Sequence, residues 1–305
     1  MEISAKVIAR SKCSHSGKEI VTFELIYPRM ILAELNTHRI LSKNSASSRA
    51  IPIAKVIEAV RNDPAMPVHW GRNQPGMSAR EELTGLDLQA VQEYWRDAAN
   101  YAACVAEQMD NIGAHKQVAN RILEPFQWMK TVLTGTEFDN FFHLRNHADA
   151  DPNIRALAAA MWKALQETPT VTLQPGDWHM PYFGDGYWLQ GCGIPLEDAL
   201  AISSSCAAQT SFRTSDDSLE KAQRIFDRLV ESKPVHASPF EHQATPMHAV
   251  DWKLNINLRS FPQTWETGIT AMGRDGNFWS GNFCGFIQHR QLIPDNACWD
   301  YKEQV

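Results

Sequence analysis

Residues 37–49 read Thr-His-Arg-Ile-Leu-Ser-Lys-Asn-Ser-Ala-Ser-Ser-Arg, and we call them the His-Arg segment. A helix end that carries His38 and Arg39, followed by a loop rich in hydroxyl groups and by Arg49, is suited to hold a phosphate. Backbone N–H groups and serine hydroxyls donate to phosphate oxygens, and an arginine binds two such oxygens at once. A solvated loop with an exposed arginine is the alternative, and both interpretations stay open on this segment alone.

Residues 236–242 read His-Ala-Ser-Pro-Phe-Glu-His, and we call them the Pro-Phe-Glu segment. Like the His-Arg segment, it mixes imidazoles with polar side chains and is too polar to be core filler. The two segments together suit a phosphate and a polar heterocycle. Taken alone, the Pro-Phe-Glu segment can also be a loop that fixes the start of a strand, with His242 as a hydrogen-bonded core residue.

Two further arginines stand in apolar helical patterns, Arg121 in residues 120–125 and Arg145 in residues 140–145. An unpaired cation is costly to bury, so each arginine must have a partner. The partner is either a bound ligand or a carboxylate on a neighbouring helix, and we name Glu124 and Glu137 as examples.

These segments resemble the signatures of flavin-dependent thymidylate synthases. That family carries R-H-R-x-x-S, followed by Asn and Ser-x-Arg, with the spacing of the His-Arg segment; here Thr37 replaces the first arginine and Ser45 the usual acidic residue. The family's R-I-x-x-P and N-F-x-x-L-R segments are similar to residues 121–125 and 140–145. Its H-x-[ST]-P-F-E-H segment is similar to the Pro-Phe-Glu segment.

The resemblance implies roles for individual residues. Arg145 would grip the pyrimidine and take the catalytic role of stabilising charge on it. Glu34 stands where the family usually has a glutamine near the nucleotide, and a carboxylate there would repel a phosphate unless it is protonated or paired. The other implied nucleotide ligands are Ser47, Ser48, Arg49 and Arg121. The implied flavin contacts are His38, Arg39, Asn140, Ser211, His236, Ser238 and Glu241.

The order of the segments differs from the family's order. There, the H-x-[ST]-P-F-E-H segment precedes the His-Arg segment, whereas here it follows by about two hundred positions. A circular permutation is the simplest explanation, and it requires the original termini to lie close together. Residues 287–292 also resemble a second, degenerate His-Arg helix, so either His38 and Arg39 or His289 and Arg290 contact the flavin.

The sequence predicts an α+β fold, an antiparallel sheet flanked by long helices. We expect a nucleotide-binding half over residues 1–167 and a flavin-binding half over residues 168–305, intertwined in one domain. Alternation predicts a strand over residues 20–26 and a β-like stretch near 251–258. Helical spacing predicts helices over residues 30–41, 53–61, 88–112, 152–167, 215–230 and 283–292, and residues 44–52 are expected to form a loop.

Composition limits the possible partners. The 305 residues carry a net charge of −6 without a long basic run, so we expect no duplex nucleic acid partner. No stretch approaches the roughly 20 apolar residues needed to cross a bilayer, so we expect no membrane partner. The six cysteines form no C-x-x-C pair, and a metal site is not expected. We expect a cytoplasmic protein with reduced cysteines.

The favoured function is transfer of a one-carbon unit from methylenetetrahydrofolate to C5 of dUMP. The resemblance implies FAD as cofactor, recharged by NADPH, and a homo-oligomer, dimer or tetramer, with sites between subunits. A flavin-dependent hydroxymethylase acting on dUMP or dCMP is the close alternative. More distant alternatives are a metal-dependent phosphohydrolase that uses His143, His147 and Asp149, and a non-catalytic nucleotide-binding protein.

Overall fold

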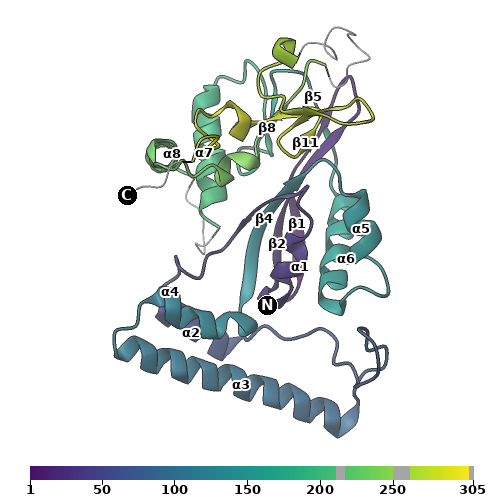
Figure 1. The fold of residues 1–305 in the computed structure, drawn as a ribbon, viewed down its shortest axis with the longest axis vertical. Coiled ribbons are helices and arrows are strands. Elements are labelled where there is room, and N and C mark those ends of the chain that lie inside the picture. The colour runs from purple at the N-terminus through teal and green to yellow at the C-terminus, as the bar shows by residue number, and fades with distance from the viewer. Residues whose placement is uncertain (211–216, 250–261, 302–305) are drawn as a thin grey trace.

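The computed structural model describes residues 1–210, 217–249 and 262–301. The chain has an α+β fold with antiparallel sheets and helices, which confirms the fold class that the sequence predicts. Figure 1 shows long central strands, with α5 and α6 beside them, a helical layer of α2, α3 and α4 at one end, and the C-terminal part of the chain at the other.

The central sheet has five strands in the order β3-β4-β2-β1-β5. They are β1 (Ser4–Cys13), β2 (Glu19–Pro28), β3 (Ser42–Ser45), β4 (Trp128–Gly135) and β5 (Val171–Leu173). All neighbours run antiparallel except β1 and β5. Because side chains alternate along a strand, the two faces of this sheet meet different parts of the chain.

The first face packs under helices. Apolar residues of β2 and β4 form one core with the helices η1 (Arg29–Ile31), α1 (Leu32–Asn36), α5 (Asp139–Arg145) and α6 (Pro152–Glu167). The α6 helix begins as predicted, because the Asp151 carboxylate accepts from the first free N–H groups and a proline follows it.

A separate helical layer holds α2 (Ile53–Asn62), α3 (Gly85–Asn111), α4 (Lys116–Ala119) and η2 (Asn120–Phe126). The α3 helix buries a stripe of small residues, Ala99, Ala103 and Ala106, in the core that it shares with α2. The helices predicted over residues 53–61 and 88–112 agree with α2 and α3 to within three residues at each end.

The second face of the sheet meets the C-terminal part. The helices there are α7 (Leu196–Ala208), α8 (Leu219–Glu231), η3 (Ser238–Glu241), η5 (Pro262–Thr264) and η6 (His289–Leu292). The strands are β6 (Trp178–His179), β7 (Tyr187–Trp188), β8 (Ala244–Pro246), β9 (Ala271–Met272), β10 (Phe278–Ser280), β11 (Phe283–Cys284) and β12 (Phe286–Gln288).

Two predicted helices are wrong, and one predicted loop is right except at its first two residues. The helix expected over residues 30–41 ends at Asn36 and gives way to a turn, and the loop expected over residues 44–52 begins inside β3. The helix expected over residues 283–292 is instead β11, β12 and the short η6, because Gly285 has a φ of 76°, which breaks a helix. The β-like stretch near 251–258 lies outside the described residues.

No helix within the described residues is both long and apolar enough to cross a bilayer. The division of the chain at residue 168 stays a prediction.

Candidate functional site

Arg145, the last residue of α5, lies against the turn that follows α1. Its Nε donates to Nε2 of His38 at 2.9 Å, and its Nη2 donates to Oγ1 of Thr37 at 3.3 Å. Its Nη1 lies 3.5 Å from a carboxylate oxygen of Glu34. We call these four residues the Arg145 cluster. From the sequence, Glu34 is expected to repel a phosphate unless its carboxylate is protonated or paired. In the structure the carboxylate lies next to the Arg145 guanidinium.

Arg145 fixes the protonation of His38. A guanidinium has no acceptor atom, so Nε2 of His38 must accept from Arg145 and the ring proton lies on Nδ1. Burial lowers the pKa of His38, and the positive charges of Arg145 and Lys43 lower it further. The cluster therefore presents a neutral imidazole with one N–H donor beside a permanent cation.

A second cluster forms around Glu124 in η2. Its Oε1 accepts from Nη2 of Arg29 at 2.8 Å, from Nη1 of Arg121 at 2.9 Å and from the hydroxyl of Ser48 at 3.2 Å. Nδ2 of Asn120 donates to the backbone carbonyl of Ser48 at 2.7 Å, which holds the end of the His-Arg segment against η2. We call Arg29, Ser48, Arg121 and Glu124 the Glu124 cluster.

Lys43 lies where the His-Arg and Pro-Phe-Glu segments meet. Its Nζ donates to the backbone carbonyls of His38 at 2.5 Å and Leu41 at 2.9 Å. Strand β3 packs against η3, and burial lowers the pKa of Lys43 to about 8, although the Glu241 carboxylate opposes this change. The fold thus brings together two segments that are about two hundred residues apart in the sequence.

The second His-Arg pair supports the Pro-Phe-Glu segment from within the C-terminal part. His289 is buried among the rings of Trp178, Phe226 and Phe240, and Arg290 forms an ion pair with Glu241. His38 and Arg39 differ from this pair, because Arg39 is exposed and His38 contacts Arg145. Which pair contacts a flavin stays a prediction.

A chain of buried hydroxyls and imidazoles crosses the second face of the sheet. His179 bonds Ser11 through Nδ1 at 2.9 Å and Thr22 through Nε2 at 2.8 Å. Thr22 bonds Thr134 at 2.8 Å, and Thr134 bonds Nδ1 of His242 at 2.8 Å. Burial lowers the pKa of both histidines to about 3, so both rings are neutral. This polar chain ties the last residue of the Pro-Phe-Glu segment to the sheet.

The remaining candidate residues differ in their surroundings. Exposed side chains that could meet a ligand belong to Arg39, Arg49, Asn140, His236 and Ser238, and that of Ser47 is half-buried. Ser211 lies outside the described residues. Within the described part of the chain, no hydrogen bond or ion pair joins the Arg145 cluster to the Glu124 cluster.

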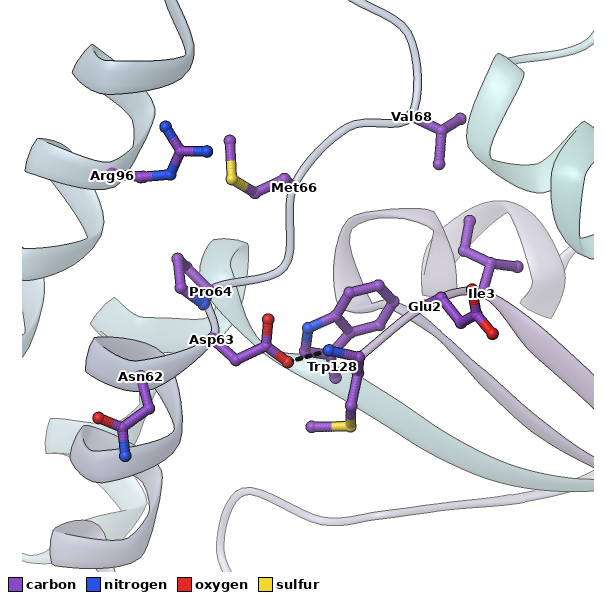
Figure 2. Close-up of a pocket in the computed structure, with 10 residues that line it drawn as sticks. Glu2, Ile3, Asn62, Asp63, Pro64, Met66, Val68, Arg96 and Trp128 are labelled. Atoms are coloured by element: carbon purple, nitrogen blue, oxygen red, sulfur yellow. Dashed lines mark hydrogen bonds and ion pairs between the residues drawn. The ribbon is translucent and has the colours of Figure 1, made fainter.

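A cavity of about 370 Å³ is lined by no member of either cluster, although Trp128 in its lining pairs with Pro28, the residue before Arg29. The cavity is lined by the N-terminal residues, the loop after α2, Arg96 and Trp128, and a dashed line in Figure 2 marks the ion pair between the N-terminal amine and Asp63. None of the residues expected to bind nucleotide or flavin lines it.

Among the described residues, no group of three or more His, Cys, Asp or Glu side chains could hold a metal ion. His147 lies 3.8 Å from Asp149, and both side chains are exposed.

A protein-family model described as thymidylate synthase complementing protein matches residues 13–169. The chain belongs to this family. The match includes the His-Arg segment, Arg121 and Arg145, which confirms the resemblance that the sequence indicated. It does not include the Pro-Phe-Glu segment, so the circular permutation stays a hypothesis.

Two solved structures similar to this member of the thymidylate synthase complementing protein family are crystal structures of a UMP/dUMP methylase PolB from Streptomyces cacaoi. The structure bound with 5-Br dUMP has 15% sequence identity and a TM-score of 0.46, and the match covers 54% of this chain and 90% of that chain. The structure bound with 5-Br UMP has 16% identity and a TM-score of 0.44, covering 54% and 89%. No curated protein sequence matches the chain.

The sequence showed no sign of two members of this arrangement and indicated only part of the role of a third. Arg29 follows a proline at a strand end, and Lys43 occupies a variable position of the family signature, so neither carried a signal. Glu124 was named only as an ion-pair partner for Arg121, and that ion pair is present at 2.9 Å.

Lys43 gives the first testable prediction. We expect its amine to titrate near pH 8 instead of its ordinary value of 10.5, because the folded chain disfavours the charged form. Reductive methylation with a ¹³C label and NMR measures this pKa, and Lys43→Arg identifies the resonance.

The charge on Glu241 supplies the control for that titration. Glu241→Gln removes the negative charge that favours the ammonium and leaves Arg290 unpaired, so the pKa of Lys43 should fall further. A Lys43 resonance that titrates at the ordinary value would show that the amine is solvated.

Proposed function

We propose that this chain transfers a one-carbon unit from methylenetetrahydrofolate to C5 of dUMP, with FAD as cofactor and NADPH as reductant. The family match over residues 13–169 carries the proposal. The positions that match the family signature and could bind a nucleotide include Ser48, Arg49, Arg121 and Arg145.

Arg145 is the residue proposed to act on the pyrimidine. Its guanidinium would stabilise the negative charge that develops on the ring as C5 becomes a nucleophile. The contacts with Glu34, Thr37 and His38 fix its orientation before the ligand arrives, so little reorganisation is needed. His38 is neutral and does not compete with Arg145 for that negative charge.

The phosphate would bind near the end of the His-Arg segment. Ser47, Ser48 and Arg49 lie in the turn after β3, and Arg121 is brought to Ser48 by Glu124. Hydroxyl and guanidinium donors are the groups that recognise a phosphate monoester in proteins.

The donor set also suits a flavin. His38, Arg39, Asn140, His236 and Ser238 offer N–H and O–H groups of the kind that bind the pyrophosphate and the ring oxygens of FAD. Strand β3 of the His-Arg segment packs against η3 of the Pro-Phe-Glu segment, and the charges of Lys43 and Glu241 attract each other there, while Asn140 lies in α5. When bound, the flavin would supply the hydride chemistry, and the protein would position it.

One observation favours the close alternative, a flavin-dependent hydroxymethylase that accepts dUMP or dCMP. Two positions at which the chain departs from the family signature, Glu34 and Thr37, both contact Arg145. A changed contact beside the pyrimidine can change the accepted base or admit water to the intermediate. Ser45 is a weaker candidate, because its hydroxyl is bonded to Thr131 at 2.8 Å.

The family resemblance supports a homo-oligomeric site. Within the described part of one chain, no hydrogen bond or ion pair joins the Arg145 cluster to the Glu124 cluster, and the proposal needs both to hold one nucleotide. We propose that clusters from different copies complete each site, in a dimer or tetramer.

Flavin binding tests the proposal directly. Purified protein, mixed with FAD and passed through a desalting column, should keep the visible absorbance of an oxidised flavin. A colourless protein would contradict the proposal, and metal in place of flavin would favour a phosphohydrolase.

Arg49→Ala is expected to raise the KM for dUMP by about 10- to 100-fold, because a charge-assisted contact contributes about 1.5–3 kcal/mol. Steady-state kinetics with saturating flavin measures this change. Arg72→Ala removes an exposed arginine distant in sequence from the candidate segments and should leave KM unchanged. An unchanged KM for Arg49→Ala would show that Arg49 is a solvated surface residue.

A further inference from the structure

One carboxylate oxygen in the Glu124 cluster receives three donors. Two guanidinium groups and one hydroxyl converge on Oε1 of Glu124 at 2.8, 2.9 and 3.2 Å. In a phosphate-binding site built from arginine and serine, guanidinium and hydroxyl groups donate to a phosphate oxygen in the same way. The donors come from separate parts of the chain, since Arg29 follows β2, Ser48 follows β3 and Arg121 lies in η2.

Burial differs among the members of the cluster. The side chain of Arg29 is 14% exposed and that of Glu124 is 24% exposed, whereas that of Arg121 is 55% exposed. Burial is the main cause that lowers the pKa of Arg29, and Glu124 opposes that effect. Arg29 therefore needs an anion in this position, while Arg121 can reach solvent.

We infer that Glu124 is an internal anion that occupies the position of a phosphate oxygen in the free chain, and that Arg29 is a further phosphate-binding residue. The inference rests on the proposed function for the identity of the ligand, a phosphate monoester. It goes beyond that function in naming a residue that competes with the substrate.

The charges explain why Glu124 would compete. Two arginines and one carboxylate leave the cluster with one net positive charge, and a phosphate dianion that bound beside Glu124 would meet like charge at close range. The carboxylate must therefore leave the guanidinium groups before both can bind phosphate. Its partial exposure and the exposed side of Arg121 give it a path into water.

Glu124→Gln tests the competition without flavin or turnover. Inorganic phosphate is the probe, and isothermal titration calorimetry at low ionic strength measures its affinity. We expect the variant to bind phosphate at least about ten-fold more tightly than the wild type, because the competing charge is gone while the side-chain shape is kept. Phosphate should also raise the Tm of the variant by more than it raises that of the wild type.

Two further variants complete the experiment. Glu167→Gln, which removes an exposed carboxylate paired with Lys163, changes the net charge equally and should leave phosphate affinity unchanged. Arg29→Met should abolish the gain when combined with Glu124→Gln. If Glu124→Gln does not fold, Arg121→Met replaces an exposed side chain and should weaken phosphate binding to the wild-type chain about ten-fold.

The outcomes separate this inference from the proposed function. Equal or weaker phosphate binding by folded Glu124→Gln, or a gain that survives Arg29→Met, overturns the role assigned to Glu124 and Arg29. An Arg121→Met variant that binds phosphate as the wild type does overturns the site itself. Tighter binding by Glu124→Gln in a protein that neither holds flavin nor converts dUMP would support the phosphate site and contradict the reaction.

Discussion

Arg145→Ala is expected to reduce kcat by about 10²- to 10³-fold, the cost of removing one preorganised donor from developing negative charge. The variant should lose kcat and still bind flavin, because His38 is the one proposed flavin contact to which Arg145 donates a hydrogen bond among the described residues. Three contacts hold the guanidinium in place, so its removal also leaves His38 and Glu34 without their common partner.

Arg155→Ala is the matched control for Arg145. Arg155 is an exposed arginine of α6, and its removal should change kcat little. Arg145→Lys keeps a positive charge without the planar fork and should give an intermediate rate. Turnover by Arg145→Ala at the wild-type rate would remove Arg145 from its proposed role.

Thr134→Val is expected to lower the free energy of unfolding by about 1–3 kcal/mol, because it leaves the buried His242 ring without a hydrogen bond and removes one of the two partners of Thr22. Thr134 bonds both Thr22 and Nδ1 of His242, and all three side chains are fully buried. Valine has nearly the same shape, so the loss reports the missing hydroxyl and not a cavity.

Thr172→Val provides the comparison for Thr134. Thr172 is an exposed threonine of β5, and its replacement should change the free energy of unfolding by no more than about 0.5 kcal/mol. Urea unfolding measures both values. If Thr134→Val costs no more than Thr172→Val, the polar chain does not stabilise the junction between the sheet and the Pro-Phe-Glu segment.

Local rules predicted the long helices and missed most of the sheet. The α3 and α6 helices carry apolar spacing over many turns, and α6 also carries a capping aspartate and a proline. Strands β1 and β4 have no such signal: β1 includes the exposed Lys6 and the half-buried Arg10 and Lys12, and its partners are set by the fold. Pairing with neighbouring strands, and not the local sequence, therefore determines that these two segments form strands.

The candidate site was predictable only where family signatures exist. The signatures brought Arg145 and the His-Arg segment to attention, and the structure adds that Glu34 and Thr37 hold Arg145. Lys43, Arg29 and Glu124 act through contacts between elements distant in the sequence, which no local pattern encodes. The His-Arg helix was predicted too long, because a short turn after Asn36 is needed to place His38 against Arg145.

Mass spectrometry of the nucleotide product shows directly whether the protein transfers a one-carbon unit to dUMP. The purified protein is supplied with FAD, NADPH, methylenetetrahydrofolate and either dUMP or dCMP. We predict that dUMP gains the mass of one CH₂ unit, and that Arg145→Ala forms this product at least about 100-fold more slowly. Recovery of both nucleotides unchanged, from protein that retains its flavin, would contradict this prediction.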